Sequence, residues 1–77
     1  MSIGRGEGAD LVLNDDNVSR HHAEITFELT GRSAITDRRS TNGVFVNNVN
    51  AGRQPRELRD GDLILLGNTY IQFFVFR

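Results

Sequence analysis

The sequence predicts an all-β fold, an antiparallel β-sandwich built from many short strands. Short apolar or alternating runs recur along the whole chain, and each is bounded by turn residues such as glycine, asparagine, aspartate and serine. Nowhere do apolar residues recur at helical spacing for three turns. A chain of 77 residues forms one domain at most, and its eight glycines and single proline are typical of a turn-rich fold.

Charge and composition narrow the classes of function. Nine basic and ten acidic side chains leave a net charge of −1, which is unsuited to general nucleic-acid binding. Cysteine is absent, which excludes disulfides and thiolate metal sites and fits a reducing compartment. The first residues lack the apolar region of a signal peptide, and no apolar run is long enough to span a membrane. We therefore expect an intracellular, cytoplasmic protein that binds neither nucleic acid nor membranes.

The first part of the chain predicts a strand, a glycine-rich loop and a second strand. Residues 3–5 end the first strand, residues 6–9 form the loop, and residues 10–13 form the second strand. Arg5 stands at the rim of this loop. It is either a solvated charge or a guanidinium that grips an oxyanion, and the local sequence leaves both readings open.

A clearer pattern begins at His22. Apolar residues alternate with polar ones through residue 29, which predicts a half-buried antiparallel strand with Ala23, Ile25, Phe27 and Leu29 on one face. Residues 30–33 read as a hairpin turn and residues 34–37 as the returning strand. Because neighbouring strand residues point to opposite faces, His21 and His22 cannot easily share a metal ion, and we expect no metal site.

The second half of the chain predicts further short strands around one polar loop. Residues 40–43, Ser-Thr-Asn-Gly, read as a tight turn or as a binding loop at the end of a sheet. The other expected elements are strands at 44–47, 49, 63–66 and 69–76, turns at 60–62 and 67–68, and an irregular connection at 54–59. In the last strand, alternation sends Ile71, Phe73 and Val75 to one face, and one face of this strand should pack on the core. The other face carries Tyr70, Gln72, Phe74 and Phe76.

Four blocks in order resemble the forkhead-associated (FHA) domain family. They are Gly4-Arg5, Ser19-Arg20-His21-His22, Ser40-Thr41-Asn42-Gly43, and residues 58–67 with their Asp-Gly-Asp turn. Each block is weak alone, but together they cover nearly the whole chain. The resemblance implies a SMAD/FHA-like β-sandwich whose loops at one end bind a phosphothreonine peptide from a substrate of a Ser/Thr kinase, as a signalling adaptor.

The resemblance also implies a role for each matching residue. The phosphate ligands would be Arg5, Ser19, Arg20 and Thr41, and Asn42 would hold the peptide backbone. The loop-structuring residues would be Gly4, His22, Ser40 and Gly43. Preference for neighbouring peptide residues would come from Asn17, Asn47, Asn48 and Asn68. No cofactor, metal or catalytic residue is implied.

Two departures from the family pattern carry expectations of their own. Val44 stands where the family commonly has threonine, so a hydroxyl is missing beside the loop. Almost nothing precedes Gly4, whereas members of the family usually carry a first strand there. We therefore expect residues 1–77 to be a single FHA domain from a longer protein. It would be truncated at its N-terminus and lack the family's first strand, the one that precedes the strand ending at residues 3–5. A sandwich of that kind has an open strand edge that could self-associate.

Two alternative functions follow from the sequence. The first is a phosphate-independent interaction or self-association domain of the same fold. The second is an enzyme, because Ser19 or Ser40, His22 and Asp37 are the residue types of a hydrolytic triad. No nucleophile elbow accompanies them, and so short a chain has little room for a substrate pocket. We expect no catalysis.

Overall fold

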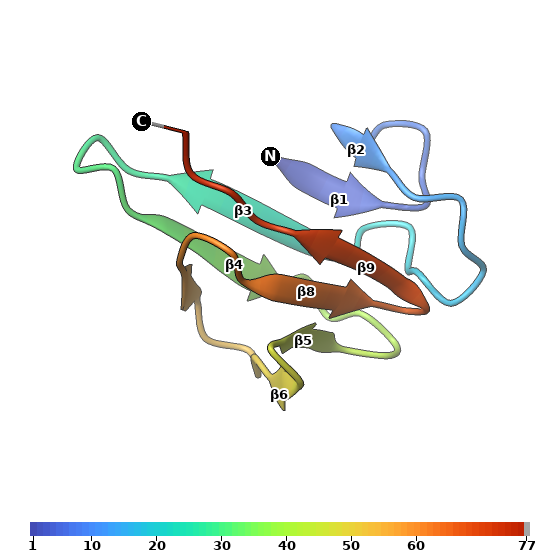
Figure 1. Ribbon diagram of the computed structural model, residues 1–77. Helices are drawn as coiled ribbons and strands as arrows, with labels where there is room; N and C mark the ends of the chain where they lie inside the picture. The colour runs from blue at the N-terminus through green and yellow to red at the C-terminus, as the bar shows by residue number, and fades with distance from the viewer. Residues whose placement is uncertain (77) are drawn as a thin grey trace.

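The computed structural model describes residues 1–76, and all the regular elements within this range are β-strands (Figure 1). The nine strands of these residues are β1 (Ser2–Gly4), β2 (Leu11–Val12), β3 (Ala23–Phe27), β4 (Ser33–Asp37), β5 (Val44–Val46), β6 (Val49–Asn50), β7 (Arg56–Leu58), β8 (Leu63–Leu66) and β9 (Thr69–Gln72). No helix in residues 1–76 is long and apolar enough to cross a membrane.

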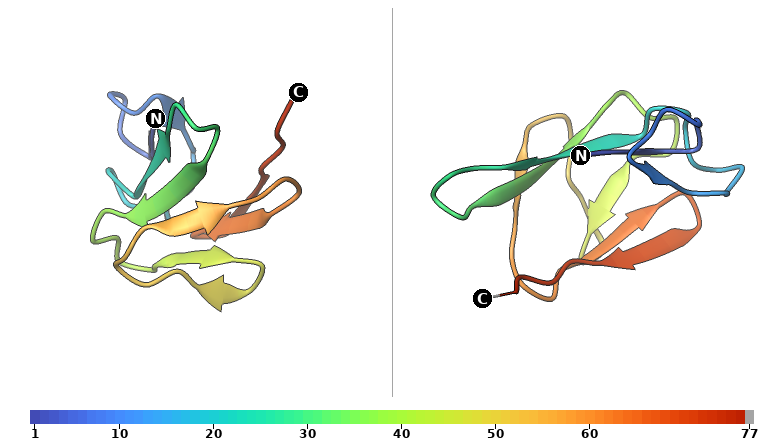
Figure 2. Two further views of the ribbon diagram at one scale, coloured as in Figure 1. Left: turned by 90° about the vertical axis from the view of Figure 1, so that its left-hand side faces the viewer. Right: turned by 90° about the horizontal axis from the view of Figure 1, so that it is seen from above.

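The strands form two sheets that face each other as layers (Figure 2). One sheet has five strands in the order β2-β1-β3-β4-β7, and the other has four in the order β6-β5-β8-β9. Strand pairing is antiparallel except between β1 and β2, which run parallel. The predicted β-sandwich is confirmed.

Alternating residues from both sheets, together with Val18 from the β2–β3 loop, fill the space between the layers. The buried apolar residues are Ile3, Val18, Ala23, Ile25, Ile35, Val44, Val46, Leu58, Ile64 and Leu66. Val44 has no exposed surface. A hydroxyl at this place would need a partner within the core, so the valine suits its surroundings.

The hairpin of β3 and β4 differs from its prediction. The strand ends at Phe27, and Leu29 lies in the turn, where the Gly31 N–H donates to the Glu28 carbonyl. Ser33 already belongs to β4. Phe27 is 62% exposed and Leu29 is fully exposed, because the tip of this hairpin projects beyond the opposite sheet (Figure 1). The expected burial of these two side chains was wrong.

Two later segments also differ from expectation. The connection at residues 54–59 contains strand β7, which pairs with β4 at the edge of the sheet and buries Leu58. Pro55 led the sequence analysis to expect an irregular connection here, although proline is tolerated beside an edge strand. The last strand ends at Gln72 instead of residue 76. After it, the Val75 N–H bonds to the Asp60 carboxylate instead of continuing the ladder.

Candidate functional site

Three loops meet at one end of the sandwich and form a hollow. They are the β1–β2 loop, the β2–β3 loop and the β4–β5 loop. The side chains around this hollow include those of Arg5, Asn17, Ser19, Arg20, Thr41 and Asn42. The structure therefore brings together all four residues predicted to hold phosphate, the residue predicted to hold the peptide backbone, and one of the four predicted to set sequence preference.

The end of β1 lies along the β2–β3 loop. The Arg5 N–H donates to the Ser19 carbonyl at 3.0 Å, and the Gly6 N–H donates to the Arg20 carbonyl at 3.2 Å. The Arg5 side chain is fixed as well, since its Nε donates to the Val18 carbonyl at 3.1 Å. The terminal nitrogens of this guanidinium form no hydrogen bond within residues 1–76, so they can bind an anion.

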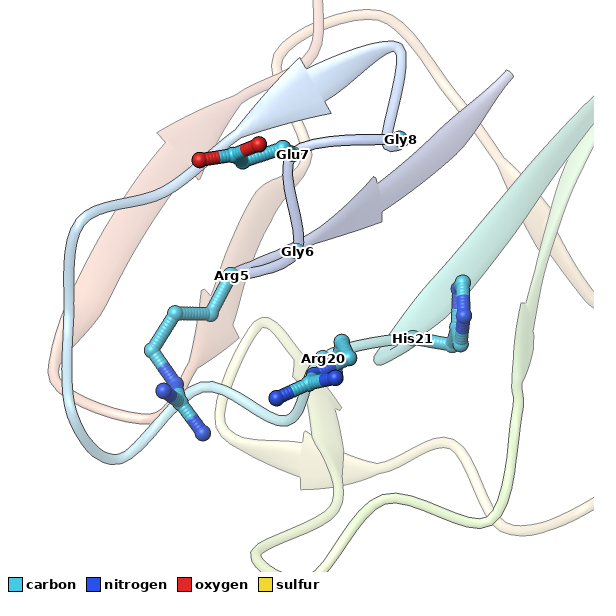
Figure 3. Close-up of a pocket in the computed structure, with 6 residues that line it drawn as sticks. All are labelled: Arg5, Gly6, Glu7, Gly8, Arg20 and His21. Atoms are coloured by element: carbon cyan, nitrogen blue, oxygen red, sulfur yellow. The ribbon is translucent and has the colours of Figure 1, made fainter.

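The position of Arg20 depends on two glycines. A side chain on Gly4 would overlap the backbone carbonyl of Arg20, so the two segments could not lie this close. A Cβ atom on Gly6 would lie 2.6 Å from Cγ of Arg20, because the Arg20 stem crosses directly over Gly6. The guanidinium groups of Arg5 and Arg20 extend toward the same side of the loop, and Glu7 points away from them (Figure 3). Sequence reasoning missed this role of Gly6.

The end of β1 and the β2–β3 loop form one wall of the hollow, and the β4–β5 loop forms the second. Hydrogen bonds within the β4–β5 loop fix the shape of this second wall. The Ser40 N–H donates to the Asp37 carboxylate at 2.8 Å, and the Gly43 N–H donates to the Ser40 hydroxyl at 2.9 Å. The Thr41 N–H crosses to the other wall and donates to the Ser19 hydroxyl at 3.0 Å. The Thr41 side chain is exposed. Ser40 therefore shapes the loop, while the hydroxyls of Ser19 and Thr41 stand at the hollow.

His22 connects the two walls from below and has no exposed surface. Its Nδ1 accepts a hydrogen bond from the Ser19 N–H at 3.0 Å, so its Nε2 carries the proton and donates to the Gly43 carbonyl at 2.7 Å. Both ring nitrogens are therefore bonded to backbone. Neither can take a proton from a serine hydroxyl, as the hydrolytic triad would require.

Asn42 and Asn17 link the loops at the outer side of the hollow. One N–H of the Asn42 amide donates to the Asn17 carbonyl at 2.8 Å. The other N–H and the carbonyl oxygen of this amide have no partner within residues 1–76. A side-chain amide with one donor and one acceptor left over matches the hydrogen-bonding groups of a peptide backbone.

Asp15 anchors the β2–β3 loop, although sequence analysis assigned it no role. Its carboxylate accepts hydrogen bonds from the Thr69 hydroxyl at 2.7 Å, the Asn17 N–H at 2.9 Å and the Asn68 N–H at 2.9 Å. These bonds, that from Thr69 foremost, lower the pKa of Asp15 below its ordinary value. An aspartate two residues before Asn17 is the local signal of such a turn.

The remaining candidates for sequence preference lie at opposite ends of the molecule. Asn68 is in the β8–β9 turn, next to the Asp15 loop. Asn47 and Asn48 form the β5–β6 turn, at the other end of β5 from Gly43. Both have left-handed φ angles, 51° and 68°, which asparagine tolerates in a hairpin turn. The structure does not bring these two asparagines to the hollow.

The FHA domain family model matches residues 1–67, which include all four sequence blocks and the three loops of the hollow. The chain belongs to the FHA domain family. This FHA domain is 47% identical over 70 residues to the FHA domain-containing protein FhaA of Mycobacterium tuberculosis, a match that covers 90% of the chain and 12% of FhaA. The chain thus spans only a small part of this curated relative.

Solved structures show the same fold. EmbR of Mycobacterium tuberculosis, in complex with a low-affinity phosphopeptide, superposes with a TM-score of 0.86 at 40% identity, over 95% of this chain and 19% of EmbR. A structure from work on phosphothreonine-dependent FHA domain interactions superposes with a TM-score of 0.91 at 39% identity, over 99% of this chain and 76% of that one.

Proposed function

We propose that this FHA domain binds phosphothreonine peptides and acts as an adaptor without catalysis of its own. The observation that carries the proposal is the meeting of Arg5, Ser19, Arg20, Thr41 and Asn42 from three separate loops around one hollow. The phosphopeptide bound to EmbR supports it, since that protein shares 40% of its residues with this chain over the superposed region.

The chemistry of the hollow matches a phosphate group. A phosphothreonine brings a charge of about −1.5 to −2 and three strong acceptor oxygens. The free nitrogens of Arg5 and the guanidinium of Arg20 supply positive charge and donors, and the hydroxyls of Ser19 and Thr41 supply two more donors. Because the backbone of the Val18 segment already holds Nε of Arg5, little ordering remains to be done on binding.

The peptide itself would lie beside Asn42. The free N–H and carbonyl oxygen of the Asn42 side chain can bond to the peptide backbone next to the phosphothreonine. Hydrogen bonds to charged groups contribute about 1.5–3 kcal/mol each. Two or three of them contribute about 3–9 kcal/mol, part of which is lost to ordering the peptide. The dissociation constant should therefore lie between millimolar and micromolar, or about −4 to −8 kcal/mol. This affinity suits a reversible signalling contact.

Fluorescence anisotropy with peptides of one sequence tests the proposal. The sequence would come from a phosphothreonine library, and the three peptides would carry phosphothreonine, phosphoserine or threonine. We expect binding of the phosphothreonine form and its loss in Arg5→Ala. Arg53→Ala removes the same charge from an exposed loop away from the hollow and should bind normally. Equal binding of the three peptides would overturn the proposal.

We also propose that residues 1–77 are one domain of a longer cytoplasmic protein, whose partners are substrates of a Ser/Thr kinase. The match to 12% of FhaA supports the first point, and the absence of cysteine fits a reducing compartment. Detecting the native protein in fractionated cells tests its location. The mass of the detected protein tests whether the domain belongs to a longer chain.

A further inference from the structure

A second hollow lies beside the proposed phosphate site. Its volume is about 510 Å³, within the range of ligand sites. Its lining residues are Arg5, Gly6, Glu7, Gly8, Arg20 and His21 (Figure 3). Among the described residues, the two hollows have only Arg5 and Arg20 in common. The two guanidinium groups therefore separate the hollows, and the second hollow lies on the side of this pair away from Asn42.

The turn at residues 6–9 keeps the second hollow open. The Ala9 N–H donates to the Gly6 carbonyl at 3.1 Å, which closes a turn whose central residues are Glu7 and Gly8. The N–H groups of these two residues donate no hydrogen bond within residues 1–76. A Cβ atom added to Gly8 would meet nothing within 4 Å. The turn therefore offers free backbone donors and leaves room for a ligand.

The side chains of the second hollow favour an anion. The guanidinium of Arg20 forms no hydrogen bond within residues 1–76, and that of Arg5 uses only its Nε. His21 is exposed, and its ring has no partner in the same range. An imidazole carries at least one N–H donor whether it is neutral or protonated. Glu7 supplies the negative charge of this lining, but it points away from both guanidinium groups (Figure 3).

We propose that the second hollow is a further anion-binding subsite, which takes a second acidic side chain of the bound phosphopeptide. This inference rests on the proposed phosphothreonine site and extends it. The phosphothreonine would occupy the first hollow, and a phosphoserine, glutamate or aspartate of the same peptide would occupy the second. Arg5 and Arg20 would contact both anions, whereas His21 would contact only the second.

The shared arginines explain why both anions belong to one peptide. A guanidinium presents its N–H donors in a planar fork, so it can bond to anions on two of its sides. Once the phosphothreonine is bound, the peptide chain holds its second anion close to the second hollow at a high effective concentration. A separate anion lacks this advantage and would also be repelled by the bound phosphate.

A position scan with doubly modified peptides tests the subsite. Each peptide carries phosphothreonine and one phosphoserine, placed one to four residues before or after it, which covers about 14 Å of extended chain on each side. Fluorescence anisotropy compares each peptide with its counterpart that carries serine at the same position. We expect the affinity to rise about tenfold on one side only, the gain from one hydrogen bond between charged groups.

Glutamate in place of the phosphoserine distinguishes the two sources of the anion. A gain with phosphoserine alone would identify a doubly phosphorylated peptide as the ligand, and a similar gain with glutamate would identify an acidic residue. Either result supports the subsite, because the second hollow would bind the anionic group in both cases.

Substitutions separate the second hollow from the first. His21→Ala should abolish the gain but leave the affinity for the singly phosphorylated peptide unchanged, because His21 does not line the first hollow. Glu7→Gln removes a carboxylate from the second hollow and should enlarge the gain. Glu28→Gln makes the same chemical change at the other end of β3 from His21 and should leave the gain as it is.

Three outcomes would overturn the inference. Equal affinity of the singly and doubly modified peptides at every position would show that no second subsite exists. An equal gain at all positions would indicate general attraction to positive charge. A gain that persists in His21→Ala would place the second anion elsewhere. In all three the singly phosphorylated peptide still binds; if it does not bind, the proposed function fails and this inference fails with it.

Discussion

Replacing Gly6 by alanine should weaken phosphopeptide binding while the domain stays folded. The new Cβ atom would lie 2.6 Å from Cγ of Arg20, whereas two carbon atoms in contact are about 3.5–4.0 Å apart. The Arg20 stem must therefore move by about 1 Å or more. The stem is flexible, so it can rotate away at little cost to the fold, but its guanidinium then leaves the hollow.

The size of the effect follows from the contact that is lost. A hydrogen bond to a charged group is worth about 1.5–3 kcal/mol. If the phosphate loses its contact with Arg20, the dissociation constant should rise roughly tenfold to a hundredfold. Anisotropy titration with the phosphothreonine peptide measures this change, and thermal unfolding should show a melting temperature close to that of the parent domain.

Gly8→Ala is the matched control. It makes the same change two residues away in the same loop, where an added Cβ meets nothing within 4 Å. Neither glycine has a positive φ angle, so both substitutions lower the entropy of the unfolded chain to a similar extent. We expect Gly8→Ala to bind the peptide like the parent domain.

A double-mutant cycle separates this explanation from a general disturbance of the loop. If Gly6 acts only by placing Arg20, adding Gly6→Ala to Arg20→Ala should cause no further loss of affinity. Additive losses would refute the reasoning, as would an unchanged affinity of Gly6→Ala in a domain where Arg20→Ala binds weakly.

Three further predictions concern the support of the site. His22→Ala leaves two backbone groups without a partner and should lower the free energy of unfolding by about 3 kcal/mol in urea denaturation; a loss below 1 kcal/mol would contradict the bracing role. Gly67→Ala combines a φ of 58° with a Cβ 2.7 Å from the Asn17 backbone, so it should destabilise the domain and weaken peptide binding. Gly52→Ala, with a φ of 70° and open space, should show only the backbone cost of about 1–2 kcal/mol, and equal peptide affinity in both variants would speak against the contact. The pKa of Asp15 is lower in the folded protein than its ordinary value of 3.8, so its contribution to stability is complete above that value and is lost as pH falls through the folded pKa. Asp15→Asn should therefore flatten the acid limb of a stability-against-pH curve below about pH 4, and a parallel curve would exclude this carboxylate as its source.

Local patterns were sufficient for most of the strands and for the set of side chains at the hollow. Period-two alternation from Ala23 and the turn residues after Asp37 depend on neighbours in the chain, so they can be read directly. The order of the motif blocks resembles that of one known family. This resemblance predicted that Arg5 and Thr41 lie at the same site. Pro55 shows where this reading fails, since an edge strand tolerates a proline that a central strand would not.

The sequence alone therefore predicted the β-sandwich, most of its turns and the residue types of the proposed phosphate site. Spatial neighbours decided the rest. Asn68 and Asn47 lie in similar turns, yet only Asn68 is at the end of the sheet where the hollow is. Gly6 matters because the Arg20 stem crosses it, and Leu58 is buried because β7 pairs with β4. Each of these features arises from contacts between segments far apart in the chain, which no local pattern encodes.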